Sequence, residues 1–376
     1  MKIGLDFTPA LYGRGVSRYT INLARALLEN SQAELSLYGY SMRRLPELIK
    51  KATGLGAGKG QLAFQKLPPS LLAKLWRFGL NPVSKLLPNL EVFHSWDWLQ
   101  PPDKNLPLVS TIHDLSQLKY EDTAHPRILK AHQRSWHVLK ERRAEIIAVS
   151  HATKQDIIDL LGIPAFKIHV VPEALPEEIK QINERLTEQE SEQIKQRLKL
   201  TRPYLLFVGT REPRKNLARL IEAWEPLAGE IDLLVAGAKG WDETTDQRYK
   251  ALPNLRFLGQ VTDIELNVLY AEAEALVFPS LDEGFGLPIL EAFYHGTPVI
   301  TSQVTALVEV AGNAAELVDP LAVEDIRRGI ELVLKEDEQA QRSRLQKMII
   351  RSHMFGWHQV ANQTLAVYAK AIQHHE

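Results

Sequence analysis

The sequence predicts an α/β protein with two doubly wound domains, each a parallel β-sheet covered by helices on both faces. Three observations lead to this fold class. The chain has 376 residues, and at roughly 150 residues per domain this length suggests two domains. Short apolar runs alternate with helical patterns through the first half, as in βαβ units. A second alternation begins near residue 204, after a charged segment poor in aromatic residues.

The composition excludes several classes of protein. Forty-five Lys and Arg residues balance 46 Asp and Glu residues, for a net charge of −1, whereas a nucleic-acid binder usually carries a clear basic excess. The absence of cysteine excludes disulfides, thiolate nucleophiles and cysteine-ligated zinc. No apolar run approaches the roughly 18 residues of a spanning helix, and the N-terminus lacks the apolar core of a signal peptide. We therefore expect a cytoplasmic protein.

The first half begins with a strand, a glycine loop and a helix. Residues 2–7 form a short alternating run, Gly13-Arg14-Gly15-Val16 follows, and apolar residues then recur with helical spacing at Tyr19, Leu23 and Leu27. Further strand-like runs end in polar clusters at residues 35–40, 91–95, 108–114 and 145–150. A helix over 152–161 and a strand over 167–171 complete this half.

In the second half, we expect strands at residues 204–209, 231–237, 255–259, 275–280 and 298–301, because most of these apolar runs stop at or beside Gly, Pro or Ser. A last helix around 357–372 carries Val360, Thr364, Val367 and Ala371 on one face. We place the first domain at 1–175, a partly helical linker at 176–202, the second domain at 203–351 and a C-terminal helical segment at 352–376.

Residues 43–85 form a basic segment within this neutral chain. The segment contains nine Lys and Arg residues but one acid, Glu47, and apolar residues such as Phe64, Leu72, Trp76 and Phe78 lie among them. Basic residues mixed with aromatic ones are typical of a face that binds an anionic membrane surface. They also occur on ordinary loop-rich surfaces, where lysine stems lie along apolar neighbours. Both interpretations stay open.

The strongest functional signal is the run Pro279-Ser280-Leu281-Asp282-Glu283-Gly284-Phe285-Gly286-Leu287-Pro288-Ile289-Leu290-Glu291-Ala292. A strand is expected to end at Ser280, two glycines allow a ligand to approach the backbone, and Pro288 suits the first turn of a helix. The helix would direct its positively polarised N-terminus into a loop at the carboxyl end of a strand. Glu283 in the loop and Glu291 in the first turn would flank an anion site, and their oxygens suit sugar hydroxyls.

A second signal is the run Val208-Gly209-Thr210-Arg211-Glu212-Pro213-Arg214-Lys215-Asn216-Leu217. A strand ends, a short loop carries three cations, and a helix begins near Asn216. Cations at the carboxyl end of a strand can neutralise a diphosphate leaving group. Lys215 is the first candidate, Arg214 the second and Arg211 the third, and a solvated loop is the alternative.

Two weaker signals lie in the first half. The loop that holds Gly15 lacks the full G-x-G-x-x-G spacing of a dinucleotide site, although its backbone could face a ligand. His113 follows a strand, so its imidazole would lie at the carboxyl edge of the sheet as a substrate contact, with a structural role as the alternative. The other histidines show no metal spacing, and Asp242 and Asp246 are too far apart for a paired-aspartate site. Nothing in the sequence requires a metal.

The run from Glu283 to Ala292, with two glutamates eight residues apart, resembles the signature of retaining glycosyltransferases of family 4. Their GT-B fold has two Rossmann-like domains that face a cleft. The resemblance covers nearly the whole chain, including Gly15-Val16-Ser17-Arg18-Tyr19, Thr111-Ile112-His113-Asp114-Leu115, Ala148-Val149-Ser150, Val208–Leu217, Gly237-Ala238-Lys239-Gly240-Trp241 and Phe278-Pro279-Ser280. It implies that the second domain binds a nucleotide-activated sugar, that the first binds the acceptor, and that the C-terminal helix crosses back onto the first domain.

The resemblance also implies roles for single residues. Glu291 matches the glutamate that holds the ribose hydroxyls, Glu283 the one near the transferred sugar, and His113 the histidine beside that sugar. Lys215 matches the diphosphate lysine. The remaining donor-binding positions are expected at Gly15, Gly209, Val261, Gly284, Phe285, Gly286 and Leu287. Thr210 stands where the family usually has Arg, so we transfer that role to Arg214. Pro172-Glu173-Ala174 replaces the usual asparagine–glycine pair, which leaves acceptor geometry open.

From this resemblance we expect a retaining, metal-independent enzyme without a cofactor. It would move a hexose from GDP-mannose or a UDP-hexose to a saccharide or lipid-linked acceptor in cell-surface polysaccharide or glycolipid synthesis. The run Glu212-Pro213-Arg214-Lys215-Asn216 resembles members that transfer mannose. The basic segment would place the enzyme at the inner face of the plasma membrane. The alternatives are a related sugar-nucleotide hydrolase, epimerase or phosphorylase, or a non-catalytic nucleotide-sugar scaffold; the oligomeric state is not predicted.

Overall fold

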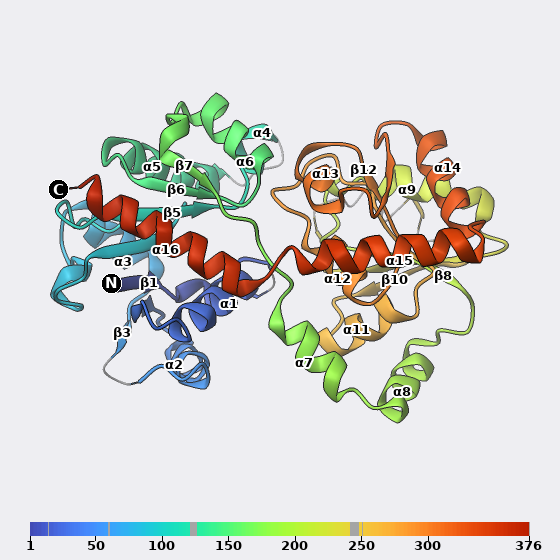
Figure 1. Ribbon diagram of the computed structural model, residues 1–376, viewed down its shortest axis with the longest axis horizontal. Helices are drawn as coiled ribbons and strands as arrows, with labels where there is room; N and C mark the ends of the chain where they lie inside the picture. The colour runs from blue at the N-terminus through green and yellow to red at the C-terminus, as the bar shows by residue number, and fades with distance from the viewer. Residues whose placement is uncertain (14, 59–60, 121–125, 241–247, 250, 376) are drawn as a thin grey trace. The chain divides into compact units, whose positions relative to one another are not determined.

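The computed structural model describes residues 1–13, 15–58, 61–120, 126–240, 248–249 and 251–375 (Figure 1). Contacts within the chain define two units. Unit 1 comprises Met1–Ala174 and Gly356–Glu376, and unit 2 comprises Leu175–Phe355. Arg14, Lys59, Trp241 and the Asp242–Asp246 pair, which the sequence analysis names, lie outside the described residues.

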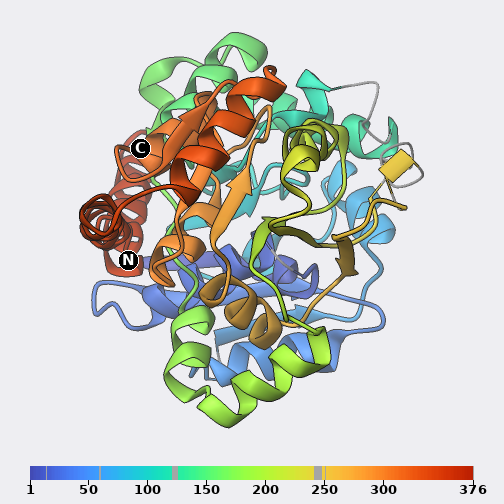
Figure 2. The same ribbon diagram turned by 90° about the vertical axis from the view of Figure 1, so that its right-hand side faces the viewer.

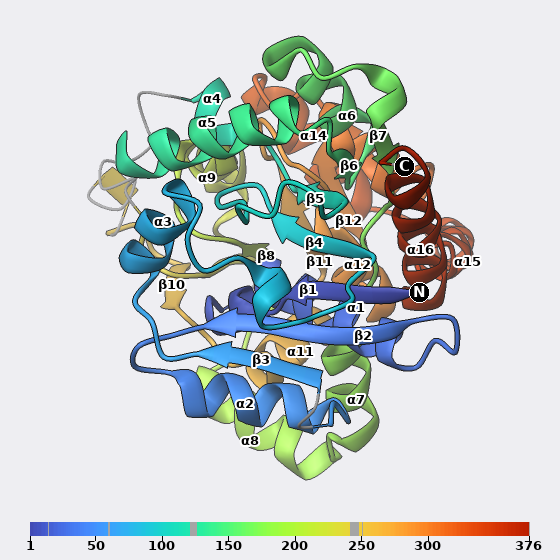
Figure 3. The ribbon, with the colours of Figure 1, turned by 90° about the vertical axis from the view of Figure 1, so that its left-hand side faces the viewer.

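Unit 1 contains a seven-stranded parallel sheet with the order β3-β2-β1-β4-β5-β6-β7, which can be followed in Figure 3. The strands are β1 (Lys2–Asp6), β2 (Glu34–Tyr40), β3 (Leu62–Gln65), β4 (Val92–Trp96), β5 (Leu108–Ile112), β6 (Glu145–Ala148) and β7 (Ile168–Val170). Six of them occupy predicted runs. The prediction missed β3, an edge strand inside the basic segment whose residues are all half-buried, so it lacks the fully apolar pattern of its neighbours.

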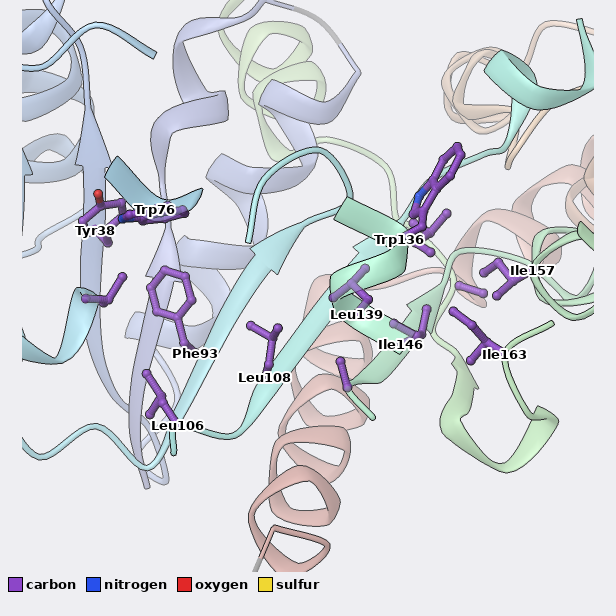
Figure 4. Packing of buried hydrophobic residues seen from close by; sticks show 14 of the residues in the cluster. Tyr38, Trp76, Phe93, Leu106, Leu108, Trp136, Leu139, Ile146, Ile157 and Ile163 are labelled. Atoms are coloured by element: carbon purple, nitrogen blue, oxygen red, sulfur yellow. The ribbon is translucent and has the colours of Figure 1, made fainter. Parts of the chain in front are cut away.

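Helices cover both faces of this sheet. They are α1 (Val16–Leu28), α2 (Leu45–Gly54), α3 (Pro69–Arg77), α4 (Ser116–Lys119), α5 (Pro126–Glu141), α6 (His151–Asp156) and α16 (Trp357–Gln373). On one face, Phe93 of β4 and Leu108 of β5 belong to a cluster that includes Trp76 of α3 and Trp136 of α5 (Figure 4). Alternate strand residues point to opposite faces, so His94 lies on the face that α16 covers.

The C-terminal helix α16 belongs to unit 1, which confirms the predicted return to the first domain. Val360, Thr364, Val367 and Ala371 are all buried, as their spacing predicts. The Tyr368 hydroxyl lies 2.7 Å from His94 Nδ1, and His94 Nε2 lies 2.8 Å from Thr111 Oγ1. This chain of polar groups joins the helix to β4 and β5. Figure 1 shows α16 beside α1, with which it is in contact.

Unit 2 contains a six-stranded parallel sheet with the order β10-β9-β8-β11-β12-β13. Figure 2 shows its strands and helices in colours from yellow-green to orange. The strands are β8 (Tyr204–Val208), β9 (Asp232–Ala236), β10 (Leu255–Gly259), β11 (Ala275–Phe278), β12 (Val299–Ser302) and β13 (Glu316–Val318). Five were predicted, whereas β13, in which only Val318 is buried, was missed. The helices are α7 (Glu177–Arg185), α8 (Glu188–Leu198), α9 (Leu217–Trp224), α11 (Asp263–Ala271), α12 (Leu287–Tyr294), α13 (Thr305–Ala311), α14 (Val323–Leu334) and α15 (Glu338–His353).

The predicted linker over 176–202 is corrected by the structure. Its charged residues form α7 and α8, which contact α11 and belong to unit 2. A single buried residue in each helix, Ile179 and Ile194, anchors an otherwise polar surface helix. Such sparse apolar positions resemble a linker composition. The boundary before the C-terminal segment also moves, from residue 352 to Gly356, because α15 continues to His353.

Each sheet has one position where the strand order reverses. In unit 1 the chain winds outward from β1 to β2 and β3, and then from β4 toward β7. In unit 2 the corresponding pair is β8 and β11. Open α/β sheets bind ligands outside the carboxyl ends of strands at such a switch point. The residues after β1 and β4, and those after β8 and β11, are therefore the places to look for sites.

Candidate active site

An ion network lies at the carboxyl ends of β8 and β11. Lys215 Nζ donates to Glu283 Oε1 at 2.6 Å, and the Arg214 guanidinium donates to Glu283 Oε2 at 3.0 Å. Arg214 also donates to Glu212 Oε1 at 2.7 Å and to the Asp282 carbonyl at 2.5 Å. The four charged side chains are 10–14% exposed. The structure thus brings together Arg214, Lys215 and Glu283, which follow the neighbouring strands β8 and β11.

The cations control the ionisation of Glu283. Burial alone would raise the pKa of this carboxyl, but the charges of Lys215 and Arg214 outweigh burial and hold the pKa at about 2. The network contains two carboxylates and two cations, so it carries no net charge at neutral pH. Its side chains are held at fixed positions, which is the condition for stabilising charge that develops during a reaction.

Aromatic rings lie against the cations. The Lys215 ammonium lies 5.1 Å from the centre of the Phe278 ring, at the end of β11. Arg211, the third candidate cation, is buried, and its guanidinium lies 5.1 Å from the centre of the Phe257 ring of β10. Both distances are within the range of cation–π attraction. Arg211 therefore lies on the side of the loop that faces β10.

Close backbone packing explains two glycines of this region. A Cβ atom on Gly237 would lie 1.8 Å from the carbonyl oxygen of Gly209, and one on Gly240 would lie 2.0 Å from the carbonyl oxygen of Arg211. The loops after β8 and β9 are therefore in contact through their backbones. Only glycine permits this approach. Gly209 thus supports the cation loop as well as ending the strand.

The start of α12 follows the Glu283 loop directly. Gly286 is the N-cap with φ 108°, a left-handed conformation that favours glycine, and Pro288 lies in the first turn. Gly284, Phe285 and Gly286 are buried, and Leu287 is half-buried. The Leu281 N–H donates to the Arg214 carbonyl at 2.8 Å, which ties this loop to the cation loop. The positively polarised start of α12 therefore follows the ion network directly, although Pro288 has no N–H and the Ile289 N–H donates to the Gly286 carbonyl at 3.0 Å.

Glu291 differs from the sequence expectation in one respect. It is the fifth residue of α12, so it lies in the second turn and not the first. The side chain is buried, and its Oε2 accepts a hydrogen bond of 2.8 Å from the Tyr270 hydroxyl of α11. Val261, the position expected near the base, is buried in the loop between β10 and α11. Both residues are held in unit 2 by neighbouring elements.

In unit 1, His113 forms a buried pair with a residue that the sequence analysis did not select. Its Nδ1 lies 2.8 Å from Glu173 Oε1, and the two side chains are 16% and 8% exposed. Among the described residues, His113 Nε2 has no hydrogen-bond partner. Burial alone would lower the pKa of His113, but the hydrogen bond and charge of Glu173, together with Asp97 and Asp114, raise it. Glu173 replaces the family's usual asparagine–glycine pair, and that departure was the available signal.

Gly15, the remaining candidate of unit 1, is the N-cap of α1 with φ 66°. No heavy atom would lie within 4 Å of a Cβ atom placed on it, so the left-handed backbone, and not a lack of space, favours glycine there. It follows β1 at the switch point of the first sheet. The structure thus places Gly15 and His113 in unit 1 and the other candidates in unit 2.

The basic segment forms α2, β3 and α3 with their connections. Trp76 and Leu72 of α3 are buried in the core, whereas Leu71, Phe78, Leu80 and Leu86 are 41%, 66%, 54% and 39% exposed. Its described cations are exposed, apart from half-buried Lys51, which donates to the Ala10 carbonyl at 2.7 Å. Part of the apolar surface predicted for this segment therefore belongs to the core of unit 1. The exposed apolar residues lie on α3 and just after it. Within the described residues, no helix is long and apolar enough to span a membrane.

Comparison with known proteins adds to this geometry. Residues 188–348 match the family described as glycosyl transferases group 1, and residues 13–178 match glycosyltransferase family 4. O-antigen chain mannosyltransferase B of Escherichia coli is 30% identical over 98% of this chain and 99% of its own length. The chain belongs to glycosyltransferase family 4. The ion network and the α12 loop lie within the group 1 match, and the His113–Glu173 pair lies within the family 4 match.

Solved structures of glycosyltransferases share the fold. The structure of Anabaena Alr3699/HepE in complex with UDP and glucose has a TM-score of 0.72 at 16% identity, covering 98% of this chain and all of that one. WaaG, a glycosyltransferase involved in lipopolysaccharide biosynthesis, has a TM-score of 0.71 at 15% identity, with 97% and 98% covered. The two parallel-sheet units of this family 4 chain are therefore those of the GT-B fold. Among the described residues, no group of three or more His, Asp or Glu side chains could hold a metal ion.

Proposed function

We propose that this family 4 glycosyltransferase transfers a hexose from a nucleoside-diphosphate sugar to a saccharide or lipid-linked acceptor, with retention of anomeric configuration and without a metal. The observation that supports it most is the network of Arg214, Lys215 and Glu283 beside the start of α12. It places two cations and a helix N-terminus at the switch point of unit 2. That combination suits the pyrophosphate of a sugar donor.

In the proposed reaction, the bond between the anomeric carbon and the diphosphate oxygen breaks, and the electron pair leaves with the nucleoside diphosphate. Arg214, Lys215 and the positively polarised N-terminus of α12 stabilise the charge that develops on this leaving group. The acceptor hydroxyl attacks the oxocarbenium-like carbon from the same face, which retains the configuration. Its proton passes to the departing diphosphate oxygen, so atoms and charge balance.

The other residues have roles in binding the donor. Glu291 holds the ribose hydroxyls, with the Tyr270 hydroxyl fixing one carboxylate oxygen. Glu283 and His113 contact the transferred sugar, while Gly284 to Leu287 and Gly209 line the phosphates. Val261 contacts the nucleotide base of the donor, and Gly15 contacts a donor phosphate. Mannose is the favoured hexose, because the full-length relative carries the name O-antigen chain mannosyltransferase B and the run Glu212–Asn216 resembles mannosyl-transferring members.

Donor binding and turnover test the proposal directly. A thermal-shift screen against GDP, UDP and their hexoses should raise the melting temperature with one nucleotide series, since a ligand that binds only the folded state stabilises it. Lys215→Ala should then lose roughly 10²-fold or more in rate. Lys335→Ala is the matched control, because that lysine is 74% exposed on a helix of the same unit. Turnover of Lys215→Ala near wild type would remove Lys215 from the site.

Three further measurements test the finer parts of the proposal. Glu291→Ala should weaken nucleoside-diphosphate affinity by calorimetry. The anomeric configuration of the first product by NMR distinguishes retention from inversion, and full activity in excess chelator is expected of a metal-independent enzyme. Consumption of the donor at the same rate without any acceptor would instead favour a hydrolase or epimerase.

The exposed part of the basic segment supports attachment to an anionic lipid surface. Leu71, Lys74 and Phe78 are exposed at helical spacing on and just beyond α3, and Lys85 and Leu86 follow. Sedimentation with phosphatidylglycerol vesicles at low salt should be lost at high salt. It should also be lost in Lys74→Glu, which reverses one charge, and retained in Lys335→Glu. Failure of the wild type to bind at low salt would refute this part and leave the transfer reaction untouched.

A further inference from the structure

A cavity of about 650 Å³ lies at the amino edge of the unit 1 sheet. It is lined by the starts of β5 and β6, the end of α5, the loop before β7 and the end of α16. Figure 3 shows α16 beside β6, with which it is in contact. The strands are parallel, so Gly15 and His113, which follow β1 and β5, lie at the opposite edge. This space, called here the amino-edge cavity, is therefore separate from the candidate residues of unit 1.

The lining of the amino-edge cavity is basic, although the whole chain has a net charge of −1. Among the described lining residues, four cations accompany one carboxylate, Glu145, which gives a net charge of +3 when the histidines are neutral. The cations are Lys140, Arg142, Arg143 and Lys167. Charges of one sign that line a concave surface raise the local concentration of the opposite ion. The cavity therefore favours anions.

The carboxylate of Glu145 is already occupied by partners within unit 1. Its Oε1 accepts from Lys167 Nζ at 2.5 Å and lies 2.8 Å from His374 Nδ1, and its Oε2 lies 2.7 Å from His169 Nε2. Burial alone would raise the pKa of this carboxyl, but its hydrogen bonds to these three side chains hold the pKa at about 2. Lys167 offsets the charge of Glu145, so the other three cations of the lining stay uncompensated.

Two of these three cations can reach a ligand. Lys140 and Arg143 are exposed, and among the described residues neither has an acidic partner within ion-pair distance. The hydrogen bond of Lys140 Nζ to the Leu161 carbonyl is long, at 3.3 Å. Arg142 instead donates to three backbone carbonyls and adds charge from a fixed position. The C-terminus of α5 also favours cations, but a helix end does not need an enclosed space lined by other segments.

The remaining lining is largely apolar. Leu108, Leu139 and Ile163 line the cavity and belong to the core cluster of Figure 4. Phe166, in the loop before β7, also lines it and is 71% exposed. The volume lies within the range of about 300–1,000 Å³ that is typical of small-molecule sites. A ligand that fills this space therefore has an organic part as well as a negative charge.

We propose that the amino-edge cavity binds a soluble organic phosphate, with Lys140 and Arg143 on the phosphate and Phe166 on the apolar part. Lysine and arginine are the usual partners of phosphate oxygens, and an exposed ring beside them loses contact with water when the organic part covers it. Strand order favours a soluble ligand over a lipid, because β7 lies at one edge of the sheet and β3, inside the basic segment, at the other. The site is independent of the proposed transfer reaction.

Methyl NMR of the full chain tests the cavity locally, since Ile163 is a buried isoleucine that lines it. Its δ1 methyl resonance, assigned with Ile163→Val, is followed during titrations with phenyl phosphate, inorganic phosphate and phenol. Phenyl phosphate should bind most tightly, because it alone has both a charge and a ring. The double variant Lys140→Gln and Arg143→Asn should bind it about tenfold more weakly or worse, as expected for lost hydrogen bonds to charged groups. Asparagine tolerates the left-handed backbone of Arg143, with φ 50°.

Lys130→Gln is the matched control, because Lys130 is exposed on the same helix, α5, and does not line the cavity. It should bind phenyl phosphate as the wild type does. Phe166→Ala should weaken the binding of phenyl phosphate and leave that of inorganic phosphate unchanged. An Ile163 methyl resonance that does not move with phenyl phosphate, or equal affinity in the wild type and the double variant, overturns the proposal. Loss of sedimentation with phosphatidylglycerol vesicles in the double variant alone would assign its cations to a lipid surface and overturn the soluble ligand.

Discussion

Replacing Glu283 by glutamine removes one charge from the ion network and keeps the side chain's size. The carboxylate accepts from Lys215 and Arg214 at 2.6 and 3.0 Å and is 10% exposed. The fall of its pKa from the ordinary 4.5 to about 2 corresponds to about 3 kcal/mol, at about 1.4 kcal/mol for each tenfold change in the ionisation constant. Removal of one partner of a buried ion pair lowers the free energy of unfolding by roughly 3–5 kcal/mol, which is a similar amount. We therefore expect Glu283→Gln to destabilise this part of unit 2 by about 3 kcal/mol at pH 7.

Hydrogen exchange measures this loss where it occurs. Peptides from β8 and β11 should lose protection on the order of 10²-fold in Glu283→Gln, because local opening free energies set the exchange rate. The matched control is Glu338→Gln, which removes a carboxylate of the same unit that pairs with Arg342 at 2.7 Å but is 87% exposed. Exposed pairs contribute about 0–1 kcal/mol, so this variant should change protection little. A Glu283→Gln variant that exchanges like the control would refute the stabilising role of the network.

The stability that Glu283 contributes depends on pH in a direction set by its lowered pKa. Because the pKa of Glu283 is lowered in the folded protein, its contribution is fully present above about pH 4.5 and is lost as the pH falls through about 2. The protection difference between wild type and Glu283→Gln should shrink over that range. A double-mutant cycle with Lys215→Met tests the coupling. Lys215→Met should lower the free energy of unfolding less in Glu283→Gln than in the wild type, because there the lysine has already lost its charged partner.

Three other perturbations have definite expected outcomes. Glu173→Gln removes the hydrogen-bonded charge that raises the pKa of His113, so NMR titration of that ring should show a lower pKa than in the wild type; an unchanged titration would contradict the pairing. Tyr368→Phe leaves the buried His94 Nδ1 without its 2.7 Å partner, which should cost about 1–3 kcal/mol and speed hydrogen exchange throughout α16. Gly237→Ala puts a Cβ atom 1.8 Å from a backbone oxygen and should abolish soluble folded protein, whereas Gly229→Ala, with no atom within 4 Å, should melt near the wild-type temperature.

Most of the fold could be predicted because buried parallel strands are continuous apolar runs. All of β5, β8 and β11 is buried, and each run ends where a polar or glycine-rich loop begins. The strands that were missed lack this property, since β3 is half-buried throughout and only one residue of β13 is buried. The helices α7 and α8 were taken for a linker because each buries one residue. Burial makes a pattern easier to recognise but is not required, because β7 and β10 were predicted although most of their residues are half-buried.

Parts of the candidate site could be predicted and parts could not. The sequence places Lys215 and Glu283 at the ends of two strands, and strand order brings them together. Nothing local to Glu212 or Glu173 shows that each pairs with a functional cation or imidazole, because both pairings depend on how loops fold back. Glu291 was placed in the first turn of α12 but is its fifth residue, just beyond that turn, since a sequence does not fix where a helix begins.

The two units use one topology for different chemistry. In each, strand order reverses beside the first strand, so the loops after the first and fourth strands of the sheet lie at equivalent positions. In unit 2 those loops supply Arg214, Lys215 and Glu283, while Gly237 and Gly240 after β9 let the backbone of the cation loop approach closely. In unit 1 they supply Tyr12 and Trp98. The cations of unit 2 suit a charged ligand, whereas the rings of unit 1 offer apolar surface. Strand order reverses beside the first strand of both sheets, so this difference arises from the loop residues that follow the strands and not from the order of the strands.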